Sequence, residues 1–140
     1  MSAVDSTPQR LAGLGLARVD PQVVQRQFPG LRLLVLFGSR ARGDAHTASD
    51  WDFGYLAGPE LDVEALLEWL CRTVNSDDVD LVDLDRASGV LRHQAADHGI
   101  AVFEHVPETF VAYVIDVLRF WLDAWPVIRK SQEEQLRSLG

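Results

Sequence analysis

Short apolar runs separated by turn residues recur through the middle of the chain, a pattern that predicts strands alternating with helices. The run Leu31–Phe37 is continuous, which predicts a strand covered on both faces and ending at Gly38-Ser39. Trp51–Leu56 and Val79–Leu84 instead alternate, and in the second of these we expect only one face to meet the core. A fourth strand is expected over residues 100–103.

Helical patterns lie between these strands. A short helix is predicted from Pro21, and the turn pair Pro29-Gly30 stops it. An amphipathic helix is expected to open at Gly58-Pro59 and to end at Asn75-Ser76. A further helix is expected over about residues 87–98. The predicted order is therefore helix, strand, helical turn, strand, helix, strand, helix, strand.

The last predicted element is a long apolar helix that begins at Pro107 and is kinked or ended by Pro126. Most of its apolar stripe is expected to cover the sheet, and its members are Phe110, Val114, Val117, Leu118, Trp121, Leu122 and Trp125. Val111, Tyr113 and Phe120 lie partly off this stripe. Some apolar area is therefore expected to remain for a partner helix.

A chain of 140 residues is long enough for one core but not for two, so a single domain is expected. We place this domain at residues 20–128. Residues 1–19 are expected to form an N-terminal tail with at most a short helix, and residues 129–140 a polar C-terminal tail that frays.

The charge balance limits the classes of partner. Thirteen Lys and Arg residues against 21 Asp and Glu residues give a net charge of -8, so the surface repels nucleic-acid backbones and anionic lipid. No direct nucleic-acid binding and no membrane association are expected. Cys71 is the only cysteine, which excludes an intrachain disulfide and favours the cytoplasm.

The acidic residues are concentrated in one part of the chain, which favours the binding of a cation. Between residues 44 and 85 there are twelve acids and one base, Arg72. The acids are Asp44, Asp50, Asp52, Glu60, Asp62, Glu64, Glu68, Asp77, Asp78, Asp80, Asp83 and Asp85.

Candidate chemistry begins at the end of the first strand. Gly38 permits a sharp turn there, and the backbone amides that follow, with the Ser39 hydroxyl, begin a helix and can hold a polyphosphate. Arg40 and Arg42 can add charge-assisted hydrogen bonds to phosphate. The sequence does not distinguish between these two arginines.

Three carboxylates are candidates for metal binding and catalysis. Asp50 and Asp52 are two residues apart on a predicted strand, so their side chains project from the same face. Asp80 on the neighbouring strand would complete a site for two hard cations, with Mg²⁺ the expected ion. The other candidates for the third position are Asp77, Asp78 and Asp83.

Gly38-Ser39, ten intervening residues and then Asp50-x-Asp52 together resemble the signature of the DNA polymerase β-like nucleotidyltransferase superfamily. The Gly-Ser-Arg-Ala-Arg-Gly motif at 38–43 and the later strand Val79–Leu84 resemble the minimal nucleotidyltransferases, the antitoxin half of HEPN/MNT toxin-antitoxin pairs. The resemblance covers about residues 21–125. It implies an α/β (α+β) nucleotidyltransferase fold: a small mixed sheet of about four strands flanked by helices, with a long C-terminal helix.

The resemblance also implies an activity. It predicts an enzyme that uses ATP and Mg²⁺ to transfer AMP to a tyrosine of a partner HEPN ribonuclease toxin, and so neutralises it. Asp50, Asp52 and Asp80 would bind two Mg²⁺ ions, with Asp80 also able to take the proton of the attacking hydroxyl. Ser39 and the amides around it would hold the terminal phosphates of ATP.

Two other functions use the same features. A non-catalytic antitoxin would neutralise its toxin by binding through the aromatic C-terminal helix. A small-molecule nucleotidyltransferase, such as those that modify aminoglycosides, shares the motif but carries an additional substrate domain, for which little chain remains here.

Overall fold

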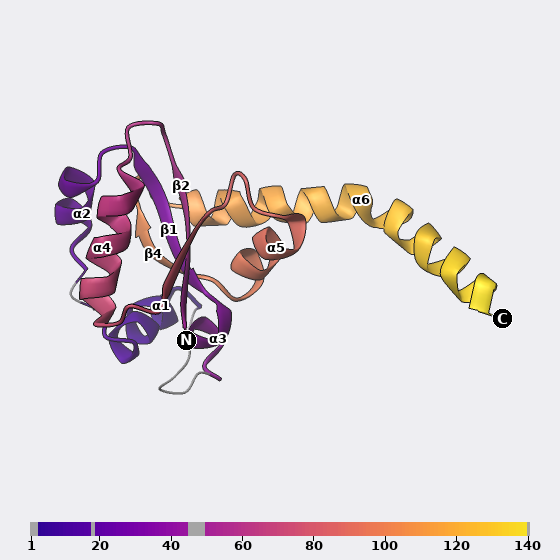
Figure 1. The fold of residues 1–140 in the computed structure, drawn as a ribbon, viewed down its shortest axis with the longest axis horizontal. Coiled ribbons are helices and arrows are strands. Elements are labelled where there is room, and N and C mark those ends of the chain that lie inside the picture. Colours follow the sequence, from indigo (N-terminus) through magenta and orange to yellow (C-terminus); the bar gives the residue numbers. More distant parts are fainter. Residues whose placement is uncertain (1–2, 18, 45–49, 140) are drawn as a thin grey trace.

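A four-stranded mixed sheet with helices on both faces organises the chain (Figure 1). The computed structural model describes residues 3–17, 19–44 and 50–139, and side chains for residues 7–17, 19–44, 50–124 and 134. The strand order is β3-β2-β1-β4, with β1 antiparallel to both of its neighbours and β2 parallel to β3. This confirms the expected small mixed sheet. The strands are β1 Leu31–Phe37, β2 Trp51–Ala57, β3 Val79–Asp83 and β4 Ile100–Glu104.

Each face of the sheet carries its own apolar layer. On one face, Trp51 and Phe53 of β2 pack with Leu66 and Leu70 of helix α4 (Val63–Val74). On the other face, Leu33 and Val35 of β1 pack with helices α5 (Gly89–His98) and α6 (Thr109–Leu139). From Leu33 to Phe37 the central strand β1 is therefore covered on both faces, as its apolar run predicts, whereas Arg32 near its start is exposed.

The expectation that only one face of the third strand meets the core is wrong. Leu81 packs into the first apolar layer, whereas Val82 and Leu84 pack into the second. Side chains on both faces of β3 therefore make apolar contacts, because helices cover both faces of the sheet.

Two helices begin later than the sequence pattern predicts, and side-chain caps explain why. Helix α4 begins after Asp62, whose carboxylate accepts a hydrogen bond from the Ala65 amide at 3.1 Å, and not at Gly58-Pro59. Helix α5 begins after Ser88, whose hydroxyl accepts from the Leu91 amide at 3.2 Å. Helix α2 (Pro21–Gln27) starts at the expected proline, with Asp20 as its cap.

The segment before residue 20 is helical and packed. Helix α1 spans Ala3–Gly13, and Leu16 just after it is only 2% exposed. Leu11 and Leu14 pack against the same apolar layer. The short helix expected in this segment is therefore α1, and apolar residues near its end attach it to the core. The limits of the domain at residues 20 and 128 stay a prediction.

Helix α6 differs most from its prediction. It begins at Thr109, because Glu108 has a φ of 71° and cannot belong to a helix. It continues past Pro126 to Leu139, so the backbone is helical where fraying was expected, while the polar tail at residues 129–140 stays a prediction as a separate segment. Figure 1 shows its C-terminal part bending and projecting away from the sheet. A proline costs a helix one hydrogen bond and bends it, but does not have to end it.

The face with which α6 packs on the sheet is also shifted in part from its expected position. Tyr113 and Val117 are core residues, at 4% and 1% exposure, whereas Leu118 and Leu122 are 48% and 72% exposed. The side chain of Trp125 lies outside the described residues. No helix in the described part of the chain is both long enough and apolar enough to cross a bilayer.

Candidate active site

The turn after β1 is formed by a short helix, α3 (Gly38–Arg42). Gly38 has a φ of 73°, a backbone conformation that side chains rarely adopt, and a Cβ at this position would collide with the carboxylate of Asp52. Glycine thus allows the α3 backbone to lie directly against Asp52. Gly43, with a φ of 86°, ends α3, and its amide donates to the Ser39 carbonyl at 3.0 Å.

The sheet register brings two of the predicted carboxylates together. Asp52 stands opposite Phe37 of β1 on one side and beside Asp80 of β3 on the other. Partners in a parallel pair project from the same face, so Asp52 and Asp80 are neighbours. Asp52 is half-buried and Asp80 is exposed. Asp50 lies just before β2 and is also exposed.

The register also separates Asp80 from its competitors. Asp83 pairs with Tyr55, three residues further along both strands and on the opposite face from Asp80. Asp77 and Asp78 precede β3 and are exposed. Asp80 is therefore the acid of this group that the sheet places beside Asp52.

Charge repulsion is concentrated on Asp52. Its burial raises the pKa of this carboxyl above the ordinary value, and the negative charges of Asp80 and Asp50 raise it further. The guanidinium of Arg42 opposes this shift. The three acids and Arg42 are thus close enough for their charges to interact.

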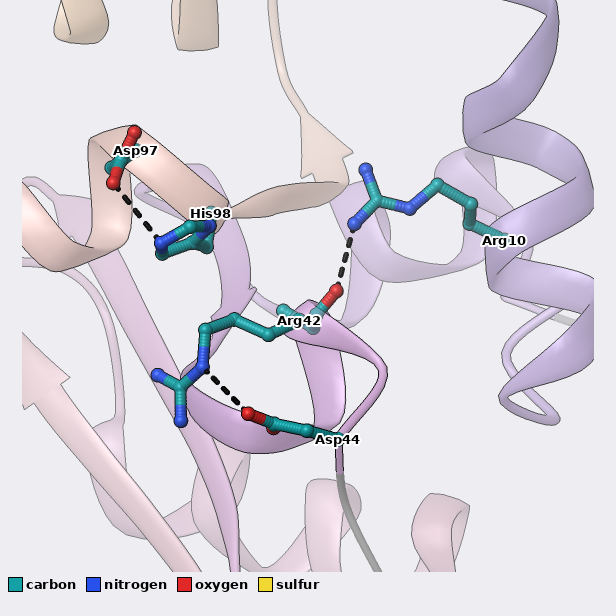
Figure 2. Close-up of polar contacts among 6 residues, drawn as sticks. Arg10, Arg42, Asp44, Asp97 and His98 are labelled. Atoms are coloured by element: carbon teal, nitrogen blue, oxygen red, sulfur yellow. Dashed lines mark hydrogen bonds and ion pairs between the residues drawn. The ribbon is translucent and has the colours of Figure 1, made fainter.

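The structure distinguishes the two candidate arginines. The Arg40 guanidinium lies over the ring of Trp51, 4.2 Å from its centroid, and Trp51 belongs to the apolar layer on the opposite face of β2 from Asp52. The charge of Arg42 acts on Asp52, and its Nε lies 3.3 Å from Asp44 Oδ2 (Figure 2). Arg42 is therefore the better placed of the two to meet a phosphate near Asp52.

Two contacts around α3 were not anticipated from the sequence. Arg10 of α1 donates from Nη2 to the Ala41 carbonyl at 2.8 Å (Figure 2). At the end of α5, which packs against α3, His98 Nε2 lies 3.0 Å from Asp97 Oδ2. A pattern of apolar and polar positions carries no signal for a hydrogen bond between residues 31 positions apart.

The carboxylates suit a hard divalent cation. Oxygen ligands are those that Mg²⁺ prefers, and a cation between Asp50, Asp52 and Asp80 would relieve the repulsion that raises the pKa of Asp52. Among the described residues, no three His, Cys, Asp or Glu side chains already converge as a metal-binding cluster. The metal ligands and the catalytic residues therefore stay predictions that the charges and the register support.

The fold and this arrangement match a known family. Residues 22–108 match the family model described as polymerase beta, nucleotidyltransferase, so the chain belongs to this family. The matched range includes α3 and all four strands of the sheet.

More particular similarities lie within that family. The chain is 32% identical to a protein adenylyltransferase MntA of Aphanizomenon flos-aquae over 60% of this chain and 64% of that protein. It is 41% identical to the protein adenylyltransferase MntA of Shewanella oneidensis over 56% of this chain and 58% of that protein. The chain thus spans less than two thirds of the length of either relative.

Solved structures show the same similarity. A crystal structure of a toxin-antitoxin with AMP-PNP superposes with a TM-score of 0.59 at 28% identity, covering 79% of this chain and 94% of that one. A tri-AMPylated Shewanella oneidensis HEPN toxin in complex with its MNT antitoxin gives 0.52 at 26% identity, covering 79% and 91%. The resemblance to minimal nucleotidyltransferases is confirmed.

Proposed function

We propose that this protein is a Mg²⁺-dependent protein adenylyltransferase antitoxin that transfers AMP from ATP to a tyrosine of a HEPN toxin and so neutralises it. The observation that carries the proposal is the Asp52 carboxylate, which lies against the Gly38 turn and beside Asp80. The two MntA relatives and the AMPylated toxin complex support the reaction class and a HEPN toxin as the acceptor, and the resemblance to minimal nucleotidyltransferases implies a tyrosine of that toxin. We place the activity in the cytoplasm, consistent with a single cysteine.

The residues of the site have separate roles in this proposal. The Ser39 hydroxyl and the amides of α3 bind the terminal phosphates of ATP, and Arg42 neutralises part of their charge. Asp80 takes the proton from the tyrosine hydroxyl as its oxygen bonds to the α-phosphorus and pyrophosphate leaves. Asp50, Asp52 and Asp80 would hold two Mg²⁺ ions, which would orient the triphosphate and stabilise the charge on the leaving group.

The proposal is tested by incubating the full chain with the folded toxin encoded beside it, ATP and Mg²⁺. Mass spectrometry of the intact toxin should show a gain of whole AMP units, located on a tyrosine by peptide fragmentation. Asp50→Asn with Asp52→Asn should abolish the gain. A folded toxin that gains no mass with the unmodified chain would exclude the activity.

A second function is favoured by one specific observation on α6. Four exposed apolar side chains follow one another at helical spacing: Val111 at 55%, Ile115 at 43%, Leu118 at 48% and Leu122 at 72% exposure. We call this set the α6 stripe. An apolar helix face of this kind suits a helical partner, so the chain could neutralise a HEPN toxin by binding alone.

The two functions differ in what they require of the carboxylates. If binding alone neutralises the toxin, Asp50→Ala with Asp52→Ala leaves cells expressing the toxin viable. If AMP transfer is needed, the same variant fails to protect them, although it still forms the complex. Growth of cells that express both proteins, together with co-purification of the pair, distinguishes the two.

A further inference from the structure

The contact between Arg10 and α3 joins the N-terminal helix to the turn that carries Ser39. Arg10 Nη2 donates to the carbonyl of Ala41 at 2.8 Å, across 31 positions of sequence (Figure 2). Arg10 lies outside residues 22–108, the range that matches the nucleotidyltransferase family. The contact is thus supplied by a part of this chain that the family match does not include.

The apolar residues that follow Arg10 hold it in place. Leu11 and Leu14 pack against the core, and Leu16 is 2% exposed, with its amide bonded to the Leu11 carbonyl at 2.8 Å. The backbone next to Arg10 is therefore fixed to the same apolar layer that receives Ala41. The guanidinium is a rigid planar group, so less conformational freedom is lost for each hydrogen bond that it makes.

The carbonyl of Ala41 belongs to α3, a helix with few stabilising interactions of its own. Helix α3 has only five residues, and its N-terminal end has no side-chain cap. The last carbonyls of a helix lack partners within that helix, and a cation there is favourable to the helix dipole. Arg10 supplies both a donor and a positive charge at this end, while the Ala41 methyl group is 4% exposed in the core.

We propose that Arg10 is a positioning residue for nucleotide binding: it fixes α3 so that Ser39 and the following amides keep their place relative to Asp52. The inference rests on the proposed function, because it assigns the triphosphate to the Gly38-Ser39 turn. Arg10 itself touches no reacting atom. Its loss should therefore weaken nucleotide affinity and leave the maximal rate nearly unchanged.

The test compares three variants of the full chain. Arg10→Met keeps the aliphatic stem and removes the donor, Arg10→Lys keeps a donor and the charge, and Arg26→Met removes an exposed arginine of α2 as the control. We expect Arg10→Met to raise the dissociation constant for Mg²⁺ and AMP-PNP, and the KM for ATP, roughly threefold to tenfold. Arg10→Lys should recover most of the affinity, and the maximal rate of AMP transfer should stay within about twofold. Unchanged affinity in Arg10→Met overturns the inference.

A second measurement does not depend on nucleotide binding. Hydrogen exchange of the amides at Gly43 and Asp44, which both donate to the Ser39 carbonyl, should accelerate in Arg10→Met but not in Arg26→Met. If the unmodified chain binds no nucleotide, the proposed function fails, and the exchange rates alone decide whether Arg10 orders α3. Equal exchange in all variants overturns the role of Arg10 even where ATP binds.

Discussion

At the scale of single residues, two glycines of the same turn differ in what they allow. Gly38 and Gly43 both have positive φ, at 73° and 86°. A methyl group at Gly38 would collide with the Asp52 carboxylate, whereas one at Gly43 would meet no described atom within 4 Å. Only Gly38 therefore couples the turn to the acidic site.

This difference predicts the outcome of a matched pair of substitutions. Gly38→Ala and Gly43→Ala should each destabilise the fold by roughly 1–2 kcal/mol, because both force alanine into a left-handed conformation. Gly38→Ala should in addition displace Asp52 and lower the rate of AMP transfer at least tenfold more than Gly43→Ala. Denaturant unfolding and the toxin mass assay measure the two effects. Equal activity of the two variants would contradict the contact.

The raised pKa of Asp52 has a consequence for stability. Burial, then the charges of Asp80 and Asp50, raise the pKa of Asp52 in the folded chain, so the folded state holds this proton more tightly than the unfolded state. Between the ordinary aspartate pKa of about 3.9 and the raised pKa of Asp52, folding takes up a proton. The stability contributed by this group is thus present at low pH and is lost as the pH rises through the raised pKa.

We therefore expect Asp52→Asn to melt at a higher temperature than the unmodified chain at about pH 7 in metal-free buffer. The difference should shrink as the pH falls toward about 4. Mg²⁺ should raise the melting temperature of the unmodified chain and not that of Asp52→Asn. Thermal melts over this range, with the exposed Asp116→Asn as control, measure the effect; a difference that does not vary with pH would refute it.

At the scale of elements, α6 presents two faces with opposite roles. Val117 and Tyr113 face the core, at 1% and 4% exposure, whereas the α6 stripe faces outward. Tyr113 is fixed further by its hydroxyl, which donates to the Arg92 carbonyl at 2.8 Å. One face thus attaches the helix to the sheet, and the other is available to a partner.

Substitutions on the two faces should separate stability from binding. Val111→Ser with Leu118→Ser should weaken the toxin complex at least tenfold and change the free energy of unfolding by less than about 0.5 kcal/mol for each exposed position. Val117→Ala should instead cost about 2 kcal/mol of stability, since it removes buried methyl groups. Titration calorimetry with the toxin and denaturant unfolding give the two values. A complex unaffected by the stripe variant would place the interface elsewhere.

The elements also show where the sequence pattern was informative. Continuous and alternating apolar runs located all four strands to within a residue at either end, because their periodicity reflects burial directly. The start of α4 was missed, since the Asp62 cap competes with an equally plausible proline start. The face of α6 was predicted in part: Val114, Val117 and Trp121 pack against the sheet as expected, as does Phe110. Leu118 and Leu122 are exposed instead, because the apolar face is wide enough that packing decides which side meets the sheet.

The site was predictable to a similar degree. The spacing from Gly38-Ser39 to Asp50 and Asp52 marked the turn and the acids, but only the register of β2 with β3 separates Asp80 from Asp83. The positions of Arg40 and Arg42 relative to the acids, and the contact of Arg10, depend on tertiary packing. The local periodicity of apolar residues encodes neither the strand register nor these arginine contacts.

At the scale of the whole molecule, the chain before β1 contributes to the core through residues near the end of α1. Leu16 is as buried as the apolar residues of the central strand, and Leu11 and Leu14 cover the same layer. Deleting residues 1–16 should therefore cost about 3 kcal/mol or more, with Leu16→Ala alone costing about 2–5 kcal/mol. Substitution of the exposed Gln9 by alanine is the control and should change stability by less than about 0.5 kcal/mol. A deletion as stable as the full chain in denaturant unfolding would refute this packing.

The apolar character of both faces of β3 has a consequence for how its alignment with β2 is specified. In a sheet with one solvent-exposed face, sliding a strand by one residue exposes its apolar side chains to water, which is unfavourable and so fixes the register. Here Leu81 and Val82 face opposite layers, so sliding β3 would exchange one apolar side chain for another at some positions. A one-residue insertion before Val79 that slid β3 along β2 would, however, put Asp80 in the place of Leu81 and Asp83 in that of Leu84, which is 0% exposed. Burying these carboxylates would cost free energy, so the acids of β3 themselves hold Asp80 in line with Asp52.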